Sequence, residues 1–418
     1  MSEELMINEE VNPVLEARKQ VIKAGLTLVE KGLIARTWGN ISARISEDAF
    51  VITPSGRSYE SLTPEDIVIV NLKNLSYEGD IKPSGEVATH AEVYRNKPEV
   101  NFVIHTHQLY ATSLSIMGED IEGYPVAKYA ICCSDALAKN VKNTIKKNPE
   151  AEGLFLRNHG VVCMGRDYDH AFEISEKIEE ICKDKYLKIC QGFINEADGN
   201  VDVNYGESYR ENGRIYLSVN GKKIDWPVGY AAMAKKDDVP KNLRGLACLH
   251  DTFYLREDVN FVSHVTAPNI VTISKLKSGR LKRGFKSYID DQCQIIGPVI
   301  KSIKIRLRKS KLKNRKQILK AMATRNAILV KSGGAICIGK TYDDIEAETL
   351  VLDKGCMAAI LVAINPKIKP IRRKIAAHMR SNYVDSYSKL KDYVPPCTPY
   401  AMDNSDNQNQ TQPDQDQI

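Results

Sequence analysis

Long apolar segments are absent from this chain of 418 residues, because none approaches the roughly 20 consecutive apolar residues that span a bilayer. The first residues, Met-Ser-Glu-Glu-Leu, are acidic and lack the basic and then apolar pattern of a secretory signal. We therefore expect no membrane association and a cytoplasmic location.

Paired cysteine motifs are also absent. The 10 cysteines are scattered, no CxxC pair occurs, and Cys132 and Cys133 are adjacent. This arrangement suits neither a disulfide framework nor a zinc knuckle. Cys163, Cys182 and Cys337 lie in apolar stretches, where a thiol behaves as a small core residue. The sequence predicts reduced thiols.

A strong excess of charge of one sign is missing, since the formal net charge is only +6. The content of 43% hydrophobic and 27% charged residues is typical of a soluble globular protein. One basic stretch, residues 301–320, could attract a polyanion. However, its charges alternate with apolar residues and no aromatic stacking platform accompanies them. We interpret it as the solvated face of a helix or strand, and we do not expect nucleic-acid binding.

The hydrophobic pattern predicts mixed helices and strands. Asn12-Pro13 is typical of a helix start, and the helix should end at Gly32. Short alternating runs then predict strands, several of them joined as hairpins, and helices over 86–96, over 108–117 and after Asp167. This alternation predicts an α/β sandwich around a largely antiparallel sheet.

An internal repeat divides the chain. Residues 157–169 resemble residues 331–343, and residues 100–105 resemble residues 259–264 in the same order. Under this pairing Glu86 corresponds to Gly245, His107 to Thr266 and His159 to Gly333. Only His264 is retained in the second copy, and a single histidine makes no metal site. The second copy is predicted to lack catalytic activity.

These observations define the expected domains. Residues 1–190 form a catalytic domain, 191–227 a connector that carries a hairpin on Asn220-Gly221, and 228–397 the degenerate repeat. Residues 398–418 are rich in Asn, Asp and Gln, which predicts a disordered polar tail.

Three histidines of the first half could bind a metal. His105 and His107 are separated by one residue in a predicted strand, so their side chains point to the same face. His159 lies in a turn between Asn158 and Gly160, from which it can project into a cleft. Three imidazoles leave a fourth position of Zn²⁺ open for water or substrate, and other divalent first-row metals are possible.

A carboxylate and several polar turns accompany the histidines. Glu86 opens a helix, where it could offset the helix dipole or act as a base over a bound substrate. The turns Gly39-Asn40, Ser55-Gly56 and Ser84-Gly85 present backbone N–H groups of the kind that cradle phosphate oxygens. Together with the histidines they predict a pocket for phosphate and metal.

The motifs 37–44, 53–56, 82–86, 105–107 and 157–160 together resemble the class II aldolase/adducin family over residues 13–190. The resemblance implies tandem α/β/α domains, the second a degenerate copy. It also implies zinc held by His105, His107 and His159, with Glu86 as the acid/base. The residues implied to hold the substrate phosphate are Gly39, Asn40, Ser55, Gly56, Ser84 and Gly85.

The function implied by this resemblance is that of a zinc-dependent lyase, a class II aldolase. It would make or break a C–C bond in a small phosphorylated ketose or aldehyde through a metal-stabilised enediolate. The alternatives are a sugar-phosphate 4-epimerase or dehydratase on the same site, and an adducin-like interaction module without chemistry. Gly85 stands where many family members have serine, and the tyrosine that protonates the aldehyde oxygen has no clear counterpart.

The resemblance also implies a homo-oligomer, because family active sites lie at subunit interfaces. The segment 117–125 is shorter than in family aldolases, and the degenerate copy is expected to replace the missing wall of the site. On this hypothesis, a chain that ends near Glu196 should lose activity or assembly.

Overall fold

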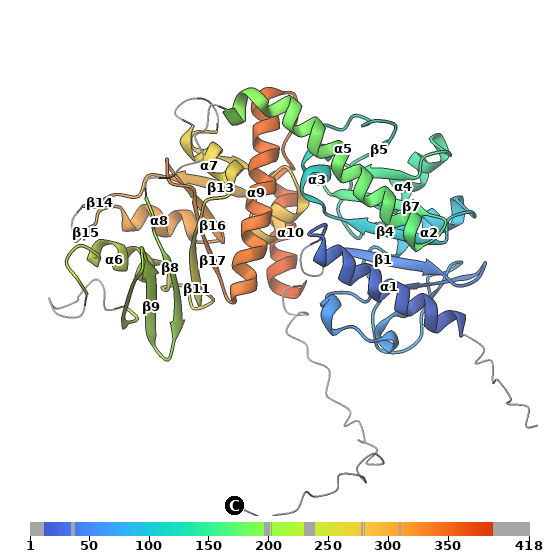
Figure 1. The fold of residues 1–418 in the computed structure, drawn as a ribbon, viewed down its shortest axis with the longest axis horizontal. Helices are drawn as coiled ribbons and strands as arrows, with labels where there is room; N and C mark the ends of the chain where they lie inside the picture. Colours follow the sequence, from blue (N-terminus) through green and yellow to red (C-terminus); the bar gives the residue numbers. More distant parts are fainter. Residues whose placement is uncertain are drawn as a thin grey trace, which may run out of the picture.

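The computed structural model describes residues 12–34, 38–195, 201, 203–229, 239–276, 279, 281–308 and 311–387. These residues form two large sheets, each with helices on both of its faces (Figure 1). The predicted fold class, tandem α/β/α domains with largely antiparallel sheets, is confirmed. Among the described residues, no helix is both long and apolar enough to cross a membrane.

The first sheet has the strand order β3-β2-β1-β4-β7-β6-β5, and its pairs are antiparallel except β5 with β6. Its strands are β1 (Gly39–Arg44), β2 (Ala49–Ile52), β3 (Val68–Asn71), β4 (Phe102–Thr106), β5 (Val126–Ala127), β6 (Gly153–Leu156) and β7 (Gly160–Gly165). The helices are α1 (Pro13–Glu30), α2 (Val87–Asn96), α3 (Leu109–Ser115), α4 (Asp135–Lys147) and α5 (Tyr168–Asn195). Two short 3-10 turns, Tyr59–Ser61 and Pro64–Asp66, precede β3.

The helix starts follow from local sequence. The side-chain oxygen of Asn12 accepts hydrogen bonds from the backbone N–H groups of Val14 and Leu15 at 3.0 and 3.3 Å, which caps α1. Asp167 caps α5 in the same way, since its Oδ1 accepts from the N–H of His170 at 2.8 Å. Both helix starts were predicted from sequence.

The second sheet repeats this topology in the order β10-β9-β8-β11-β17-β16-β13-β12. Its strands are β8 (Glu207–Glu211), β9 (Arg214–Val219), β10 (Lys222–Pro227), β11 (Phe261–Val265), β12 (Gly284–Lys286), β13 (Val299–Ile303), β16 (Ala327–Val330) and β17 (Ala335–Gly339). The helices are α6 (Arg244–Phe253), α7 (Pro268–Lys275), α8 (Arg315–Met322), α9 (Tyr342–Ile364) and α10 (Arg373–Asn382). The pair β13 with β16 is parallel, as is β5 with β6, and β12 is an added edge strand.

The predicted connector contains part of the second sheet. A hairpin forms at Asn220-Gly221, whose φ angles of 48° and 73° are both positive, as predicted for this turn. Its strands β9 and β10 pair with each other, β9 pairs with β8, and β8 pairs with β11 of the second sheet. We therefore propose that the second repeat begins near residue 204 rather than at 228.

A matching buried network marks the correspondence between the repeats. In the first, the Ser42 hydroxyl lies 2.6 Å from His90 Nδ1 and 2.7 Å from the Tyr94 hydroxyl. In the second, a serine, a histidine and a tyrosine repeat these contacts at 2.6 and 2.8 Å, namely Ser208, His250 and Tyr254. Because the two histidines correspond, Glu86 is equivalent to Leu246 and not to Gly245 as the sequence pairing suggested. Neither Leu246 nor Gly245 carries a carboxylate.

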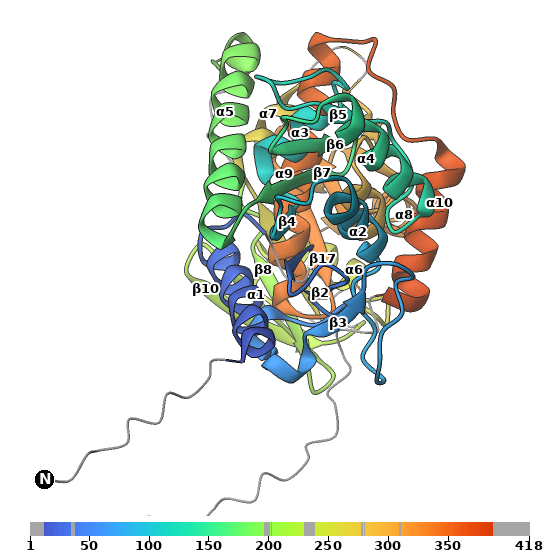
Figure 2. The ribbon, with the colours of Figure 1, turned by 90° about the vertical axis from the view of Figure 1, so that its right-hand side faces the viewer.

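The two repeats pack through a shared helical layer. Helices α2 and α4 cover one face of the first sheet, and α1, α3 and α5 cover the other (Figure 2). The core beneath α3 and α5 continues without interruption into α7 and α9 of the second repeat. The other face of the second sheet is covered by α6 and α8. Helix α9 therefore runs between the two sheets (Figure 1).

The basic stretch forms β13, a small hairpin of β14 (Leu307–Arg308) with β15 (Lys311–Leu312), and α8. Lys304 and Arg306 are exposed, while Ile305 and Ile318 between the charges are buried. The interpretation as a solvated basic face agrees with this pattern. The predicted disordered tail, 398–418, lies outside the described residues.

Candidate metal centre

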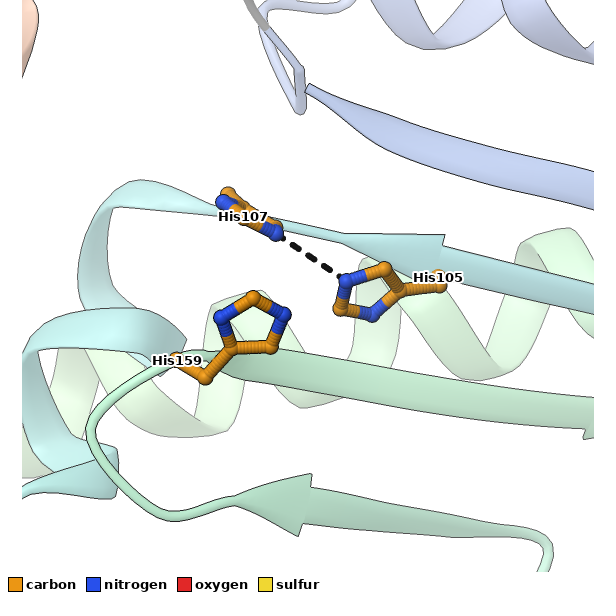
Figure 3. A group of neighbouring side chains, drawn as sticks. All are labelled: His105, His107 and His159. Carbon is orange, nitrogen blue, oxygen red and sulfur yellow. Dashed lines mark hydrogen bonds between the residues drawn. The ribbon is translucent and has the colours of Figure 1, made fainter. Parts of the chain in front are cut away.

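The three histidines singled out from sequence lie together (Figure 3). His105 is on β4, His107 follows the end of that strand, and His159 is in the turn between β6 and β7. Their potential ligand atoms all lie within 4.8 Å of one another. Strands β4 and β7 are antiparallel neighbours, so the residues that follow β4 and the turn that precedes β7 lie at the same end of the sheet. No other group of three potential ligands of this kind occurs among the described residues.

The hydrogen bonds of the rings suit a metal. His105 Nδ1 donates to the carbonyl oxygen of Val161 at 2.8 Å, and His107 Nδ1 donates to Asp291 Oδ1 at 2.6 Å. A neutral imidazole that carries its proton on Nδ1 has a lone pair on Nε2. The Nε2 atoms of His105 and His107 are 3.0 Å apart, so two lone pairs face each other. Two lone pairs that face each other repel. A metal ion that accepts both lone pairs removes this repulsion, so these donor atoms fit a bound metal ion.

Glu86 stands beside the histidines. Its Oε1 lies 3.0 Å from His159 Nε2, and its Oε2 lies 3.2 Å from His105 Nε2. The side chain is buried, and Oε2 has no hydrogen-bond partner among the described residues. Burial opposes ionisation of Glu86, but the adjacent His105 and His159 outweigh it and lower the pKa of this carboxyl below its ordinary value.

The net pKa shifts of two of the histidines are opposite in direction. It lowers the pKa of His105 to about 3, although the negative charge of Glu86 acts in the opposite direction. Burial also tends to lower the pKa of His159, but the carboxylates of Glu86 and Asp290 outweigh it and raise the pKa above its ordinary value. A neutral His105 is in the form that ligates metals.

The polar turns predicted to hold phosphate line the same cavity, which has a volume of about 370 Å³. The backbone N–H of Ser55 donates to the carbonyl of Lys82 at 3.0 Å, and the N–H of Ser84 donates to the carbonyl of Thr53 at 2.9 Å. These bonds hold two of the turns side by side. The residues that were predicted for phosphate and that line this cavity with the histidines and Glu86 are Gly39, Asn40, Ser55, Gly56, Ser84 and Gly85.

Two neighbours shape the polar wall. A Cβ atom at Gly85 would lie 2.7 Å from Cys133 Sγ, so the thiol occupies the space that a serine side chain would need. His90 is completely buried, and its Nε2 lies 2.6 Å from Asn40 Oδ1, which orients the asparagine. Burial lowers the pKa of His90 to about 4.

The second repeat contributes residues that sequence reasoning missed. Asp291 is buried and contacts His107, and Lys354 Nζ donates to Asp291 Oδ2 at 2.7 Å and to the carbonyl of His107 at 2.8 Å. Asp290 Oδ2 lies 3.2 Å from His159 Nδ1, close but not aligned for a hydrogen bond. The adjacent acids Asp290-Asp291 in an apolar stretch were the available signal.

The second repeat also forms part of the cavity wall. Gln294 from the π-helical turn η3 (Gln292–Ile296) and Met379 and Asn382 from α10 line the cavity. Tyr383, which follows α10, lines it as well. Residues of both repeats therefore line the cavity.

The equivalent position in the second repeat has no such centre. His264 Nε2 donates to the carbonyl of Gly333 at 2.6 Å, and its Nδ1 accepts from the N–H of Tyr205 at 3.3 Å. Both ring nitrogens are thus committed to the backbone. Gly333 replaces His159, as the sequence pairing indicated, and Ser332 before it keeps the positive φ, 57°, that Asn158 has at 64°.

Known relatives match less than half of this chain. L-fuculose phosphate aldolases of Methanococcus maripaludis strain S2 and of Methanococcus vannielii are each 32% identical to this chain. The matches cover 40% of this chain and 95% and 93% of those proteins. Among solved structures, an L-fuculose 1-phosphate aldolase is 28% identical, with a TM-score of 0.39, over 43% of this chain and 87% of its own. The L-fuculose-1-phosphate aldolase of Thermus thermophilus is also 28% identical, with a TM-score of 0.36, over 43% of this chain and 96% of its own.

The family profile covers both repeats. The profile described as "Class II Aldolase and Adducin N-terminal domain" matches residues 19–186 and again residues 235–360. The first range spans all strands of the first sheet, whereas the second begins after β8, β9 and β10 and runs from α6 into α9. The chain therefore belongs to the class II aldolase and adducin family, of which it contains two tandem copies.

Proposed function

We propose that the first repeat is a metal-dependent aldolase that makes or breaks a C–C bond in a small phosphorylated ketose. The observation that carries this proposal is the convergence of three imidazole side chains and one buried carboxylate at the edge of a polar cavity. Family membership supports the reaction class, and the named aldolase relatives support a sugar-phosphate substrate.

His105, His107 and His159 would hold the ion. Three imidazoles are the ligand set of catalytic zinc sites, which keep one position open for substrate, and zinc is the metal we propose. When bound, such an ion acts as a Lewis acid that polarises a carbonyl oxygen of the substrate. The backbone carbonyl of Val161 keeps the Nδ1 proton of His105, so that Nε2 is available as a ligand.

Glu86 is proposed as the acid/base. It stands beside the ligand histidines, and burial removes it from competing water. In the direction of synthesis its carboxylate accepts a proton from the carbon beside the substrate carbonyl. In the direction of cleavage it returns that proton to the same carbon. Proton transfer by a well-placed side chain contributes about 10²–10⁴-fold to a rate.

The turns Gly39-Asn40, Ser55-Gly56 and Ser84-Gly85 are proposed to bind the phosphate. They line the same cavity as Glu86, and α2 begins directly after Glu86, so its first N–H groups face this region. A phosphate held there would leave the carbonyl end of a short sugar close to the histidines. This arrangement selects for small phosphorylated substrates.

Exchange of deuterium into dihydroxyacetone phosphate tests the proposal. The zinc-loaded protein in D₂O should exchange a proton at the carbon beside the carbonyl, and Glu86→Gln should slow this exchange by about 10²–10⁴-fold while still binding zinc. Glu179→Gln is the matched control, because Glu179 is a half-buried carboxylate that does not line the cavity. Its exchange rate should equal that of the wild type.

The outcomes separate the alternatives. Stoichiometric zinc without exchange would overturn the aldolase assignment and favour an epimerase, a dehydratase or another substrate on the same residues. A protein that binds no divalent metal would instead favour an adducin-like module without chemistry. The resemblance also implied a homo-oligomer. This stays a prediction, which a measurement of the molar mass in solution by light scattering would test.

A further inference from the structure

Two segments of the second repeat reach the histidines of the first. One lies between α7 and β13, where the second repeat holds residues 276–298 and the first holds only residues 116–125 between α3 and β5. This longer segment contains β12 and the π-helical turn η3, and it carries Asp290 and Asp291. The other segment is α9, which carries Lys354. Topologically, the longer segment is an insertion in the repeat that lacks the metal centre.

Asp291 is placed to orient His107. Its Oδ1 accepts the Nδ1 proton of His107 at 2.6 Å, and its Oδ2 accepts from Lys354 Nζ at 2.7 Å. Asp291 is 2% exposed, and Lys354 is completely buried. The pair would be costly to bury for stability alone, because two ions lose their hydration. Lys354 also donates to the carbonyl of His107, so ring and backbone of this histidine are held together.

Asp290 lies beside His159 without an aligned side-chain hydrogen bond, and its contacts hold the backbone that carries this histidine. Its backbone N–H donates to the carbonyl of Asn158 at 2.9 Å, and Asn158 Nδ2 donates to the carbonyl of Tyr288 at 2.5 Å. The turn that carries His159 is therefore fastened to the inserted segment. The carboxylate of Asp290 lies 3.2 Å from His159 Nδ1 and also accepts from the Tyr129 hydroxyl at 3.0 Å.

We propose that Asp291 and Asp290 of the second repeat are positioning residues for the metal centre of the first. Asp291 directs the Nε2 atom of His107 toward the ion through its hydrogen bond to Nδ1, and Asp290 holds the turn that carries His159. Carboxylates that accept the distal N–H of a ligand imidazole set its tautomer and orientation. The inference rests on the proposed function, because it presupposes that the three histidines bind metal. It gives the second repeat a role, although the described residues of that repeat form no metal centre of their own.

Zinc affinity of the full chain tests the inference. Competition with a chromophoric chelator should show that Asp291→Asn weakens zinc binding by about 10–100-fold, the usual effect of removing such a partner. The absorption spectrum of the Co²⁺-loaded variant should also change, because the ligand field depends on ring orientation. Asp353→Asn is the matched control, since Asp353 is a buried acid of the same repeat whose bonds go to Asn269 and Ile270.

A paired variant guards against misfolding. Asp291→Asn alone leaves the buried Lys354 without its counterion, which could destabilise the fold. Asp291→Asn with Lys354→Met removes both charges, and it should still bind zinc about 10-fold or more weakly than the wild type. Wild-type zinc affinity and an unchanged Co²⁺ spectrum in these variants would overturn the inference and leave the proposed function intact. A wild-type chain that takes up no metal would overturn both.

Discussion

The Nδ1 atom of His107 and Oδ1 of Asp291 lie 2.6 Å apart, although 184 residues separate them in the chain. One residue follows β4 of the first repeat, and the other precedes η3 of the second. The contact exists because the helical layers of the two repeats share one hydrophobic core. The candidate metal centre therefore depends on the packing of both repeats.

The shared core predicts a single unfolding transition. Trp38 belongs to the first repeat and Trp226 to the second, and these are the only two tryptophans of the chain. Each of the variants Trp38→Phe and Trp226→Phe keeps one tryptophan, whose fluorescence reports the unfolding of its own repeat. In metal-free protein, the urea midpoint from fluorescence should equal the midpoint from circular dichroism of the same variant. Two separate transitions in either variant would show that the repeats unfold independently.

Met357 should contribute strongly to that core. It is completely buried on α9, and its sulfur lies 3.7 Å from the Ser113 hydroxyl of α3. Met357→Ala should lower the free energy of unfolding by about 2–5 kcal/mol, because it leaves a cavity between the repeats. The measurement is urea denaturation, and a change below about 1 kcal/mol would contradict the prediction. Leu187→Ala, at a residue that is 43% exposed on α5, is the control.

Gly85 and Cys133 should be energetically coupled. Gly85→Ser places a Cβ atom 2.7 Å from Cys133 Sγ, and such overpacking costs about 1–3 kcal/mol. Cys133→Gly removes the obstructing atoms and also suits the positive φ of 60° at this position. The cost of Gly85→Ser should therefore be smaller in the Cys133→Gly background by about 1 kcal/mol. Additive effects in a double-mutant cycle would refute the coupling.

Glu179 should make stability depend on pH. Burial raises its pKa to about 7, although its carboxylate accepts hydrogen bonds from the N–H groups of Tyr110 and Ala111. Because the folded pKa lies above the unfolded value, the contribution of this group is fully present below about pH 4.5 and is lost as the pH rises to about 7. The loss is at most about 3 kcal/mol.

The comparison of wild type with Glu179→Gln isolates this effect. Urea denaturation of metal-free protein between about pH 5 and pH 8 should show a stability that falls with pH more steeply in the wild type than in the variant. Parallel profiles for the two proteins would argue that Glu179 is ionised at its ordinary pKa in the folded state.

The buried serine of the second repeat should be structural. Ser208→Ala leaves His250 Nδ1 and the Tyr254 hydroxyl without their shared partner, which should cost about 1–3 kcal/mol of unfolding free energy. Zinc affinity should stay at the wild-type value, because none of these residues lines the metal cavity. Ser42→Ala, at the equivalent position of the first repeat, should lower stability by a similar amount. A loss of zinc affinity in Ser208→Ala would contradict this assignment.

Much of the local structure could be predicted from short-range pattern. The cap at Asn12, the hairpin at Asn220-Gly221 and the strand before His107 depend on residues a few positions apart, and the structure contains all three. The residue-by-residue correspondence between the two repeats was predicted less accurately. The sequence alignment placed Glu86 opposite Gly245, whereas the buried contacts of His90 and His250 shift the equivalence by one residue.

The sequence by itself determined that the chain is a tandem repeat and which side chains of the first copy could meet, because spacing on a strand places His105 and His107 on one face. Tertiary structure alone decided that Asp290, Asp291 and Lys354 join them. Their positions follow from the packing of α3 and α5 against α7 and α9. Contacts between residues so distant in the chain depend on how whole apolar faces fit together, and a local sequence pattern does not encode that fit.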